Sequence, residues 1–469
     1  MPLLMEAVKA LEKEFLIDDE FLRKGTDAFN KSLDNGLKAP KVGREFMPMI
    51  PAFVTKIPTG KEKGVYLAAD LGGTNFRVCS VDLHGDHTYS LIQSKSAVSE
   101  DLQRGSDATG EQLFAYLAKK IDLFIREHHC TNDVVDSSDK FKMGFTFSFP
   151  VEQTSLGSGL LIRWTKGFHL DDVIGKDVVE LLQAQLDKLG TPVHVVALAN
   201  DTVGTLLSRA YSNKDSEHVK TIVGCIFGTG TNGAYFEAYD KIPKLKENID
   251  TGSGMVINTE WGSFDNPLTF LPKTKYDDIV DNETSNIGYH LYEKRISGMF
   301  LGELVRVILI DLFEQGVLFK ELYESRGGSL PHRLTEPWGL SSEILSYIHV
   351  DDSNDLKTTQ VALDLSLRLP TTCAEREAIQ QVTRIVADRA AKLSAIPIAA
   401  IAKRVSPQYP KNVEFEIGCD GSVVEFYPGF REKVTQYVNE LDTDGRTVRL
   451  VIAKDGSGVG AALCACMAD

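Results

Sequence analysis

Two stretches of the chain share one arrangement: an apolar strand, a turn rich in glycine, threonine and asparagine, and a second strand. They are LAADLGGTNFRVCSVDLHGDH at residues 67–87 and CIFGTGTNGAYFEAYD at residues 225–240. The alternation of apolar and polar residues on both sides of each turn predicts paired strands. Such turns expose backbone N–H groups that can bind a phosphate. Any fold for this chain must therefore accommodate two similar hairpins.

The predicted elements around these turns follow the same order twice. Strands are predicted at 65–70, 76–83 and 87–94, and helices at 112–125, 171–189 and 201–212 alternate with strands at 142–149 and 193–200. The order restarts with strands at 221–228, 234–240 and 255–260. A long helical region with irregular inserts is predicted at about 275–404, followed by a strand at 413–420, a helix from about Pro428, a strand at 446–454 and a last helix. Alternating strands and helices predict an α/β fold whose sheets are mixed, mostly parallel and covered on both faces. Ligands of such sheets collect beyond the carboxyl ends of the strands.

Length and charge narrow the possible partners. A chain of 469 residues exceeds one ordinary core, so two lobes are expected. The formal net charge of −15 argues against nucleic acid and anionic membrane surfaces. The most apolar run, at 394–402, is too short to cross a bilayer, and Pro397 interrupts it. The seven cysteines form no CxxC pair, which favours reduced thiols and a cytoplasmic location.

The second turn also matches GxGxxG, the fingerprint of dinucleotide-binding dehydrogenases. That fingerprint requires a helix after the loop, whereas the AYFEAYD that follows here has the alternation of a strand. A protein-kinase glycine loop would need HRD and DFG sequences, which the chain lacks. The remaining structural interpretation is that both turns are tight hairpins without a ligand.

Several motifs together resemble the actin, heat-shock-ATPase and hexokinase superfamily. DLGGTNFRV and IFGTGTNGAY resemble its two phosphate segments, IGCDGSVVEFYPGF at 417–430 its adenosine segment, and AKDGSGVGAALCA at 453–465 its second connecting helix. GFTFSFP, RWTKGF, NDTVGT and EWGSFD are similar to hexokinase motifs, most of all to those of fungal glucokinases. The resemblance implies a duplicated ribonuclease-H-like (actin-like ATPase) fold, in which two lobes surround a central cleft and the ATP phosphates lie between the two turns.

This resemblance also implies an activity and lobe boundaries. ATP, with Mg²⁺, would phosphorylate glucose, with mannose as a second candidate, at the 6-hydroxyl to give glucose 6-phosphate and ADP. The alternative is a non-catalytic sugar sensor, which loss of the base or of a phosphate turn would favour. The small lobe would comprise 60–200 and 456–469, and the large lobe 1–59 and 201–455. D-glucose and ATP would be the partners, without nucleic acid or membrane.

The site residues implied by the resemblance fall into three groups. Asp201 would be the base that takes the proton from the sugar hydroxyl, although its position at the start of a predicted helix would by itself fit an N-cap equally well. The sugar contacts would be Ser148, Thr165, Lys166, Asn200, Asp201, Asn232, Glu260 and Glu293. The nucleotide contacts would be Asp70, Leu71, Gly72, Gly73, Thr74, Asn75, Lys95, Gly228, Thr229, Gly421 and Ser422, with Arg77 as a further positive charge. Asp70 would hold Mg²⁺ through water, because Mg²⁺ takes few protein oxygens. Phe149 departs from the family, in which many members have tyrosine.

Overall fold

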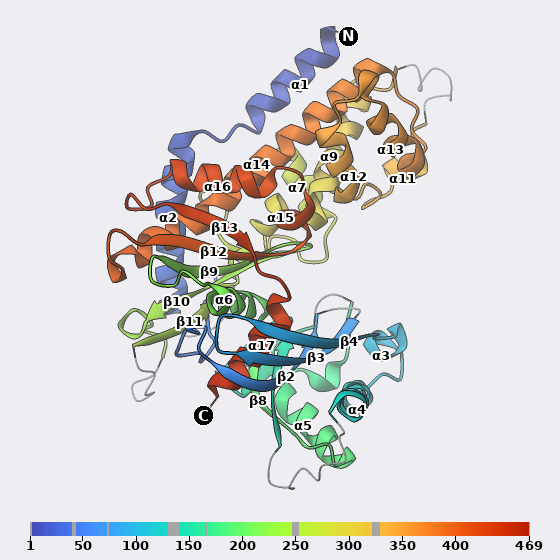
Figure 1. Cartoon of the computed structure of the whole chain (residues 1–469). Helices are drawn as coiled ribbons and strands as arrows, with labels where there is room; N and C mark the ends of the chain where they lie inside the picture. Colours follow the sequence, from blue (N-terminus) through green and yellow to red (C-terminus); the bar gives the residue numbers. More distant parts are fainter. Residues whose placement is uncertain are drawn as a thin grey trace.

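Two mixed sheets form the framework of the molecule (Figure 1). The computed structural model describes residues 2–39, 44–72, 75–129, 140–164, 167–245, 253–320 and 329–468. In these ranges the smaller sheet has the strand order β4-β3-β2-β5-β8, and its strands are β2 (Lys63–Leu71), β3 (Asn75–His84), β4 (Tyr89–Ala97), β5 (Phe141–Phe147) and β8 (Val193–Ala199). The larger sheet has the order β1-β11-β10-β9-β12-β13, and its strands are β1 (Ile50–Pro51), β9 (Val219–Phe227), β10 (Thr231–Ala238), β11 (Gly254–Asn258), β12 (Glu414–Asp420) and β13 (Val448–Ile452). A separate ribbon pairs β6 (Val151–Ser155) with β7 (Ser158–Leu161).

Both sheets pair their strands in the same pattern. In the smaller sheet β3 is antiparallel to β2 and β4, whereas β2, β5 and β8 are parallel. In the larger sheet β10 is antiparallel to β9 and β11, whereas β9, β12 and β13 are parallel. The predicted α/β class and the predicted duplication are therefore confirmed. The two glycine turns lie at the carboxyl ends of β2 and β9.

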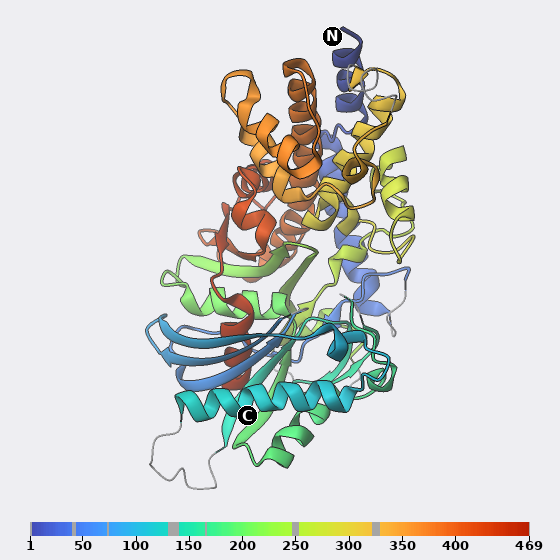
Figure 2. The same cartoon turned by 90° about the vertical axis from the view of Figure 1, so that its right-hand side faces the viewer.

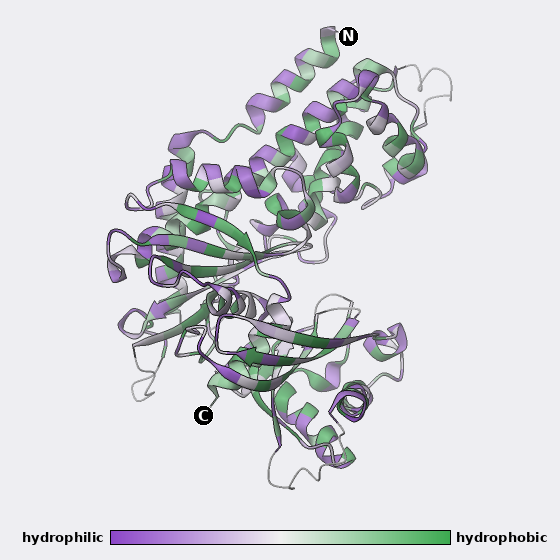
Figure 3. Cartoon of the chain, in the orientation of Figure 1, coloured by the Kyte–Doolittle hydropathy of each residue, from purple (hydrophilic) through white to green (hydrophobic). Residues whose placement is uncertain are grey.

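Helices cover both sheets and build most of the larger lobe (Figures 1 and 2). Their bounds are α1 (Pro2–Glu14), α2 (Asp19–Lys38), α3 (Glu100–Arg104), α4 (Gly110–His128), α5 (Val178–Leu189), α6 (Asp201–Ser212), α7 (Lys275–Asn282), α8 (Glu293–Ile296), α9 (Gly298–Glu314), α11 (His332–Thr335), α12 (Ser342–Val350), α13 (Lys357–Leu367), α14 (Cys373–Val405), α15 (Ser422–Phe426), α16 (Phe430–Glu440) and α17 (Gly456–Met467). α4 and α5 cover one face of the smaller sheet, and α2, α14 and α16 pack in the core of the larger lobe. Figure 3 shows hydrophobic residues on the strands of both sheets and on many of the helices, while α1 carries many hydrophilic ones.

The predicted long helical region contains α14, which includes the most apolar run of the sequence. A capping box in which Thr372 and Glu375 bond each other's backbone N–H starts this helix. Pro397 lies inside α14 and does not end it. Within the described ranges, no helix is both long and apolar enough to cross a membrane.

The last helix of each repeat packs on the sheet of the other repeat. α6 follows β8 of the smaller sheet but packs against β9, β10 and β12, whereas α17 follows β13 of the larger sheet but packs against β2, β5 and β8. The two helices cross at glycines, because a Cβ atom at Gly460 would lie 2.0 Å from Gly204 Cα. Only residues without a side chain allow this approach of two backbones. The crossing joins the two lobes (Figure 1).

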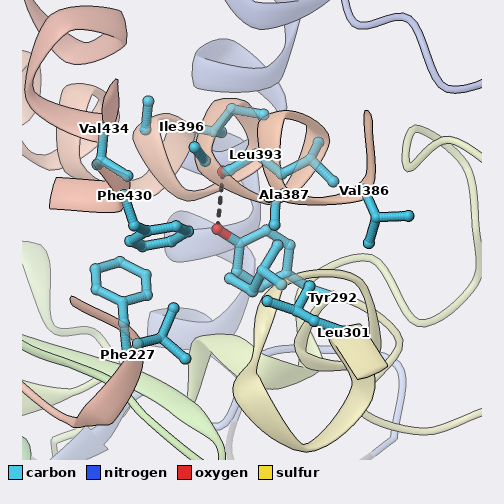
Figure 4. Close-up of a cluster of buried hydrophobic side chains, with 14 of the residues drawn as sticks. Phe227, Tyr292, Leu301, Val386, Ala387, Leu393, Ile396, Phe430 and Val434 are labelled. Atoms are coloured by element: carbon cyan, nitrogen blue, oxygen red, sulfur yellow. Dashed lines mark hydrogen bonds between the residues drawn. The ribbon is translucent and has the colours of Figure 1, made fainter. Parts of the chain in front are cut away.

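A buried apolar cluster lies behind the second glycine turn (Figure 4). Phe227, at the end of β9, packs against Phe430 of α16 with ring centroids 5.9 Å apart. Tyr292 lies in the same cluster, and its hydroxyl donates to the carbonyl of Leu393 at 2.9 Å. Phe227 precedes Gly228, and Tyr292 precedes Glu293. Core packing therefore fixes the backbone that carries two of the predicted ligand contacts.

Candidate functional site

Asp201 stands at the junction between the smaller sheet and α6. β8 ends at Ala199, and Asn200 is the N-cap of α6. The Asn200 side chain accepts a hydrogen bond from Thr202 N at 2.9 Å, so Asn200 takes the capping role that the sequence also allowed for Asp201. Asp201 Oδ1 accepts from the same N–H at 2.9 Å, and Oδ2 accepts from the Ser148 hydroxyl at 3.5 Å. The carboxylate is thus held at the positive end of a helix, with one oxygen directed to the end of β5.

An amide–carboxylate network in the larger lobe lies beside Asn200. Asn232 Nδ2 donates to Asn258 Oδ1 at 2.8 Å and to Glu260 Oε1 at 3.1 Å. Asn258 Nδ2 also donates to Glu260 Oε1, at 2.8 Å. A distance of 3.5 Å from Asn232 Nδ2 to Asn200 Oδ1 links the network to the residue before Asp201. The structure therefore brings together the predicted sugar contacts from β8, β10 and the segment after β11.

Glu260 is the carboxylate at the centre of this network. Burial raises its pKa above the ordinary value, and the charges of Asp201 and Glu293 raise it further, while the Asn258 amide and His290 act against the increase. Its backbone is in the left-handed region, with φ of 52°. A strained backbone and a buried carboxylate near two others both cost folding free energy. Such features concentrate at functional sites.

Glu293 begins α8 and reaches the second glycine turn. Its Oε2 accepts a hydrogen bond from Thr231 N at 2.9 Å, and its Oε1 lies 3.2 Å from His290 Nδ1. The buried Trp261 indole donates to Thr231 Oγ1 at 2.9 Å. A Cβ atom at Gly230 would lie 2.6 Å from Glu293 Oε2, so the turn has no room for a side chain there. Glu293 and Trp261 therefore hold the start of β10 in place.

The first glycine turn carries the carboxylate predicted to interact with Mg²⁺. Asp70 Oδ2 accepts a hydrogen bond at 2.9 Å from the hydroxyl of Ser457, in the first turn of α17. Asp70, Arg77 and Lys95 are register partners on β2, β3 and β4, so they share one face of the sheet. The cationic residues Arg77 and Lys95 are thus aligned with Asp70 across three neighbouring strands. The other predicted contacts on this turn that the structure describes are Leu71, Gly72 and Asn75.

The second glycine turn lies against the predicted adenosine segment. A Cβ atom at Gly228 would lie 3.4 Å from Gly421 Cα and 3.5 Å from Ser422 N. Gly421 has φ of +111°, which favours glycine. The carbonyl of Thr229 accepts from Met299 N at 3.2 Å, which ties the turn to the start of α9. β10 begins at Thr231, inside the GxGxxG sequence at 228–233, so the helix that a dehydrogenase fingerprint needs does not begin at this turn.

Asp420 is a carboxylate at this site that the motif analysis did not single out. Burial raises its pKa to about 6, the charge of Asp201 adds to the increase, and the Arg77 guanidinium opposes it. Its Oδ1 accepts a hydrogen bond from Gly421 N at 2.6 Å. Asp420 ends the apolar strand β12 in the way that Asp70 stands near the end of β2. That shared pattern is the sequence signal that could have identified it.

The sugar segment is described only in part. The predicted contacts Gly73, Thr74, Thr165 and Lys166 lie outside the described residues. The preceding Trp164 is fixed in the smaller lobe, where its Nε1 donates to the Leu170 carbonyl at 2.8 Å. Phe149 is buried and packs edge-on against Trp164 with ring centroids 4.9 Å apart. The departure from tyrosine therefore places a phenyl ring in the aromatic cluster of Trp164 and Phe168.

Two lobes that repeat one strand order, with a glycine turn from each near a shared polar site, define an actin-like ATPase fold. Among solved structures, a hexokinase from Schistosoma mansoni complexed with glucose matches with a TM-score of 0.84 and 36% identity, over 99% of this chain and 99% of that chain. Family models described as Hexokinase match residues 7–211 and 222–467. The chain belongs to the hexokinase family.

Within that family the chain is similar to fungal glucokinases. It is 49% identical to Glucokinase-1 of Saccharomyces cerevisiae, covering 99% of this chain and 97% of that relative. It is 45% identical to Glucokinase-1 of Kluyveromyces lactis, covering 100% and 99%. It is 42% identical to Glucokinase of Aspergillus niger, covering 99% and 97%. The resemblance seen in the motifs is therefore confirmed over the full length of the chain.

Proposed function

We propose that the chain transfers the terminal phosphoryl group of ATP to the 6-hydroxyl of glucose, giving glucose 6-phosphate and ADP. The observation that carries this proposal is the placement of Asp201 at the start of α6, beside the Asn232–Glu260 network. Membership of the hexokinase family and the similarity to glucokinases support the reaction and the sugar. The alternative of a non-catalytic sensor has no support, because the base and both turns are retained.

In this proposal the residues of the chain act by orientation and proton transfer. Asp201 takes the proton of the 6-hydroxyl as that oxygen attacks the phosphorus. The Thr202 N–H and the Ser148 hydroxyl hold the two oxygens of the Asp201 carboxylate, so its orientation is set before the sugar binds. Asn232, Glu260 and the other sugar contacts orient the hydroxyls of glucose. The backbone of the two glycine turns approaches the phosphates.

Mg²⁺ is part of the proposal, and Asp70 would hold it through water. The site fits this ion, because the Asp70 carboxylate and the Ser457 hydroxyl supply hard oxygen atoms. In the described part of the chain, no group of three or more His, Cys, Asp or Glu side chains is arranged to hold a metal. In the proposal, phosphate oxygens and water are the main ligands of Mg²⁺, and few protein side chains contact it. When bound, Mg²⁺ neutralises phosphate charge, and Arg77 and Lys95 add fixed positive charge in the same row.

We also propose the lobe boundaries 60–200 with 456–469 and 1–59 with 201–455. The packing of α6 on the larger sheet supports the boundary at 200/201, and the packing of α17 on the smaller sheet supports the boundary at 455/456. Closure of the lobes around glucose would exclude water, which could otherwise attack ATP. A cytoplasmic location is proposed from the cysteine pattern.

A coupled assay of ADP release tests this function. The full-length chain with Mg²⁺ and ATP should release ADP in proportion to added glucose, and a panel with mannose and fructose should rank the sugars. Asp201→Asn is the matched control, because it keeps the size of the side chain and removes the base. Glucose binding without ADP release from the unmodified chain would instead identify a sensor.

A further inference from the structure

His290 is a titratable side chain that acts on two carboxylates of the candidate sugar site. Its Nδ1 lies 3.2 Å from Glu293 Oε1, and 20% of each of these two side chains is exposed. An ionised carboxylate only accepts hydrogen bonds, so Nδ1 carries the proton in this contact. The charge of the same imidazole also acts on Glu260, where it opposes the increase in pKa that burial causes. Both carboxylates are predicted sugar contacts, whereas the sequence motifs give His290 no role.

The imidazole of His290 is held in place by its surroundings. It lies against the buried ring of Tyr289, with ring centroids 4.3 Å apart. The His290 carbonyl accepts a hydrogen bond from Lys294 N in α8 at 3.1 Å, and the next residue, Leu291, donates its N–H to Asn266 Oδ1 at 3.3 Å. The His290 backbone is in the left-handed region, with φ of 57°, which costs folding free energy. Strain of this kind concentrates at functional sites.

The Glu293 carboxylate is held at both of its oxygens. Oε2 accepts a hydrogen bond from Thr231 N at 2.9 Å, and Oε1 accepts from His290. With the Thr231 bond alone, the carboxylate could rotate, because a glutamate side chain has several rotatable bonds. The two contacts together fix the plane of the carboxylate, and with it the directions in which its remaining lone pairs can accept from sugar hydroxyls.

We propose that His290 is a positioning residue of the sugar site, which orients the Glu293 carboxylate by donating a hydrogen bond through Nδ1. This inference rests on the proposed function, in which Glu293 and Glu260 accept from hydroxyls of glucose. Because Glu293 is ordered before the sugar binds, its ordering does not oppose glucose binding. Asp201 and Glu293 act on Glu260 with negative charge. Protonated His290 acts on it with positive charge and therefore keeps Glu260 ionised to lower pH.

The test compares His290→Ala with His290→Asn in the full-length chain. Alanine removes the donor, so at pH 8 it should raise the KM for glucose about three- to thirty-fold, with kcat within about two-fold and the KM for ATP unchanged. Asparagine places an amide N–H close to the position of Nδ1 and tolerates a left-handed backbone. It should therefore keep the glucose KM within about two-fold of the unmodified chain. An asparagine variant as impaired as the alanine variant would overturn the role of the Nδ1 hydrogen bond.

The pH dependence of glucose affinity is a readout that a purely structural role would not change. Protonation of Glu260 removes an ionised acceptor, so affinity falls as pH falls through the pKa of this carboxyl group. Both His290→Ala and His290→Asn lack the positive charge that opposes the increase in that pKa. The fall should therefore begin at a higher pH in both variants than in the unmodified chain. The same pH dependence in all three proteins would overturn the effect of His290 on Glu260.

His218 provides a matched control, because it makes the same type of contact with a residue that is not a predicted ligand contact. Its Nδ1 lies 2.8 Å from Asp215 Oδ1, and the spacing of three residues is that of His290 and Glu293. His218→Ala should leave the glucose KM and its pH dependence unchanged. An effect equal to that of His290→Ala would show that the loss of either histidine disturbs the chain in a general way, and would overturn the positioning role.

A calorimetric titration with glucose, without ATP or Mg²⁺, separates this inference from the proposed function. It should rank the unmodified chain and the variants in the same order as the glucose KM. Unchanged glucose affinity in His290→Ala would overturn the inference, and so would a joint loss of kcat and melting temperature at normal affinity. If the unmodified chain binds glucose but releases no ADP, the proposed function is refuted, while the titration still decides the role of His290.

Discussion

Asn200 and Asp201 are neighbours in the sequence, but their side chains have different roles in the structure. Because the Asn200 amide caps α6, replacing Asp201 leaves the helix start intact. We expect Asp201→Asn to lower kcat by at least about 10²-fold, with glucose affinity and melting temperature nearly unchanged. Asn200→Ala should instead cost about 1 kcal/mol of unfolding free energy through the lost cap. Steady-state kinetics, a glucose titration and thermal unfolding measure these effects. Near-normal turnover by a folded Asp201→Asn variant would exclude the base role.

Glu260 should make stability depend on pH in a defined direction. Its folded pKa is raised above 4.5, so the folded chain holds this proton more tightly than the unfolded chain does. The contribution of Glu260 to stability is therefore complete at low pH and is lost as pH rises through the raised pKa. Glutamine cannot ionise and keeps an oxygen that accepts from Asn232 and Asn258.

Glu260→Gln should accordingly melt at a higher temperature than the unmodified chain at pH 8, and this gain should vanish near pH 4. The same change should weaken glucose binding about ten- to a hundred-fold, because the ionised acceptor is lost. Melting curves across this pH range and a glucose titration at pH 8 provide the comparison. Equal or lower stability of the variant at pH 8 would contradict the burial of a charged carboxylate.

The crossing of α6 and α17 is the contact between elements that most directly affects the site. α6 begins with Asp201, and Ser457 of α17 donates to Asp70. Gly460→Ala would place a Cβ atom 2.0 Å from Gly204 Cα and must separate the two helices. We expect a loss of stability of about 1–3 kcal/mol and a lower kcat, because Asp201, the proposed base, and the Asp70 carboxylate move apart.

Gly458→Ala, on the same helix, is the matched control for this prediction. Its Cβ atom would lie 3.1 Å from Cys79 Sγ, a side chain that can adjust. It should therefore cost less stability than Gly460→Ala and leave kcat nearly unchanged. Thermal unfolding and kinetics of both variants make the comparison. Equal effects of the two substitutions would show that the crossing does not set the geometry of the site.

The elements were predictable where local sequence determines them. Alternating apolar residues and glycine turns located β2, β3, β9 and β10, although β4 ends at Ala97, beyond the predicted 87–94. Pro397 suggested an interruption, but packing keeps it inside α14. The packing of α6 and α17, each on the sheet of the other repeat, could not be predicted from the sequence, because it depends on contacts between residues far apart in the chain. Asn258 and Ser457 were missed for the same reason, since each reaches the site through a partner on another element.

For the whole molecule, glucose alone should change the tryptophan fluorescence. Trp164 is fixed in the smaller lobe, and Trp261 is buried in the larger lobe next to Glu260. Closure around glucose should alter the polarity near at least one of these indoles without ATP or Mg²⁺. Trp164→Phe or Trp261→Phe should reduce the response.

Trp338→Phe is the control for that measurement. Trp338 packs against Phe300 of α9 with ring centroids 5.7 Å apart, and its backbone N–H donates to Glu303; neither partner is a predicted sugar contact. Its loss should leave the glucose response intact. A response carried by Trp338 alone, or no response at glucose concentrations that saturate catalysis, would argue against closure of the two lobes.

The packing of α6 and α17, each on the sheet of the other repeat, also determines how the chain can fold while a ribosome makes it. Every strand of the smaller sheet emerges before residue 200, yet the 12 residues of α17 that cover one of its faces come after the last strand of the larger sheet. Val459 and Leu463 of α17 are fully buried, so until they arrive the nascent chain exposes apolar strand surface. The smaller sheet, whose strands are all translated before residue 200, is therefore covered last, and a premature stop codon just before α17 would leave bare the face of that sheet on which α17 packs.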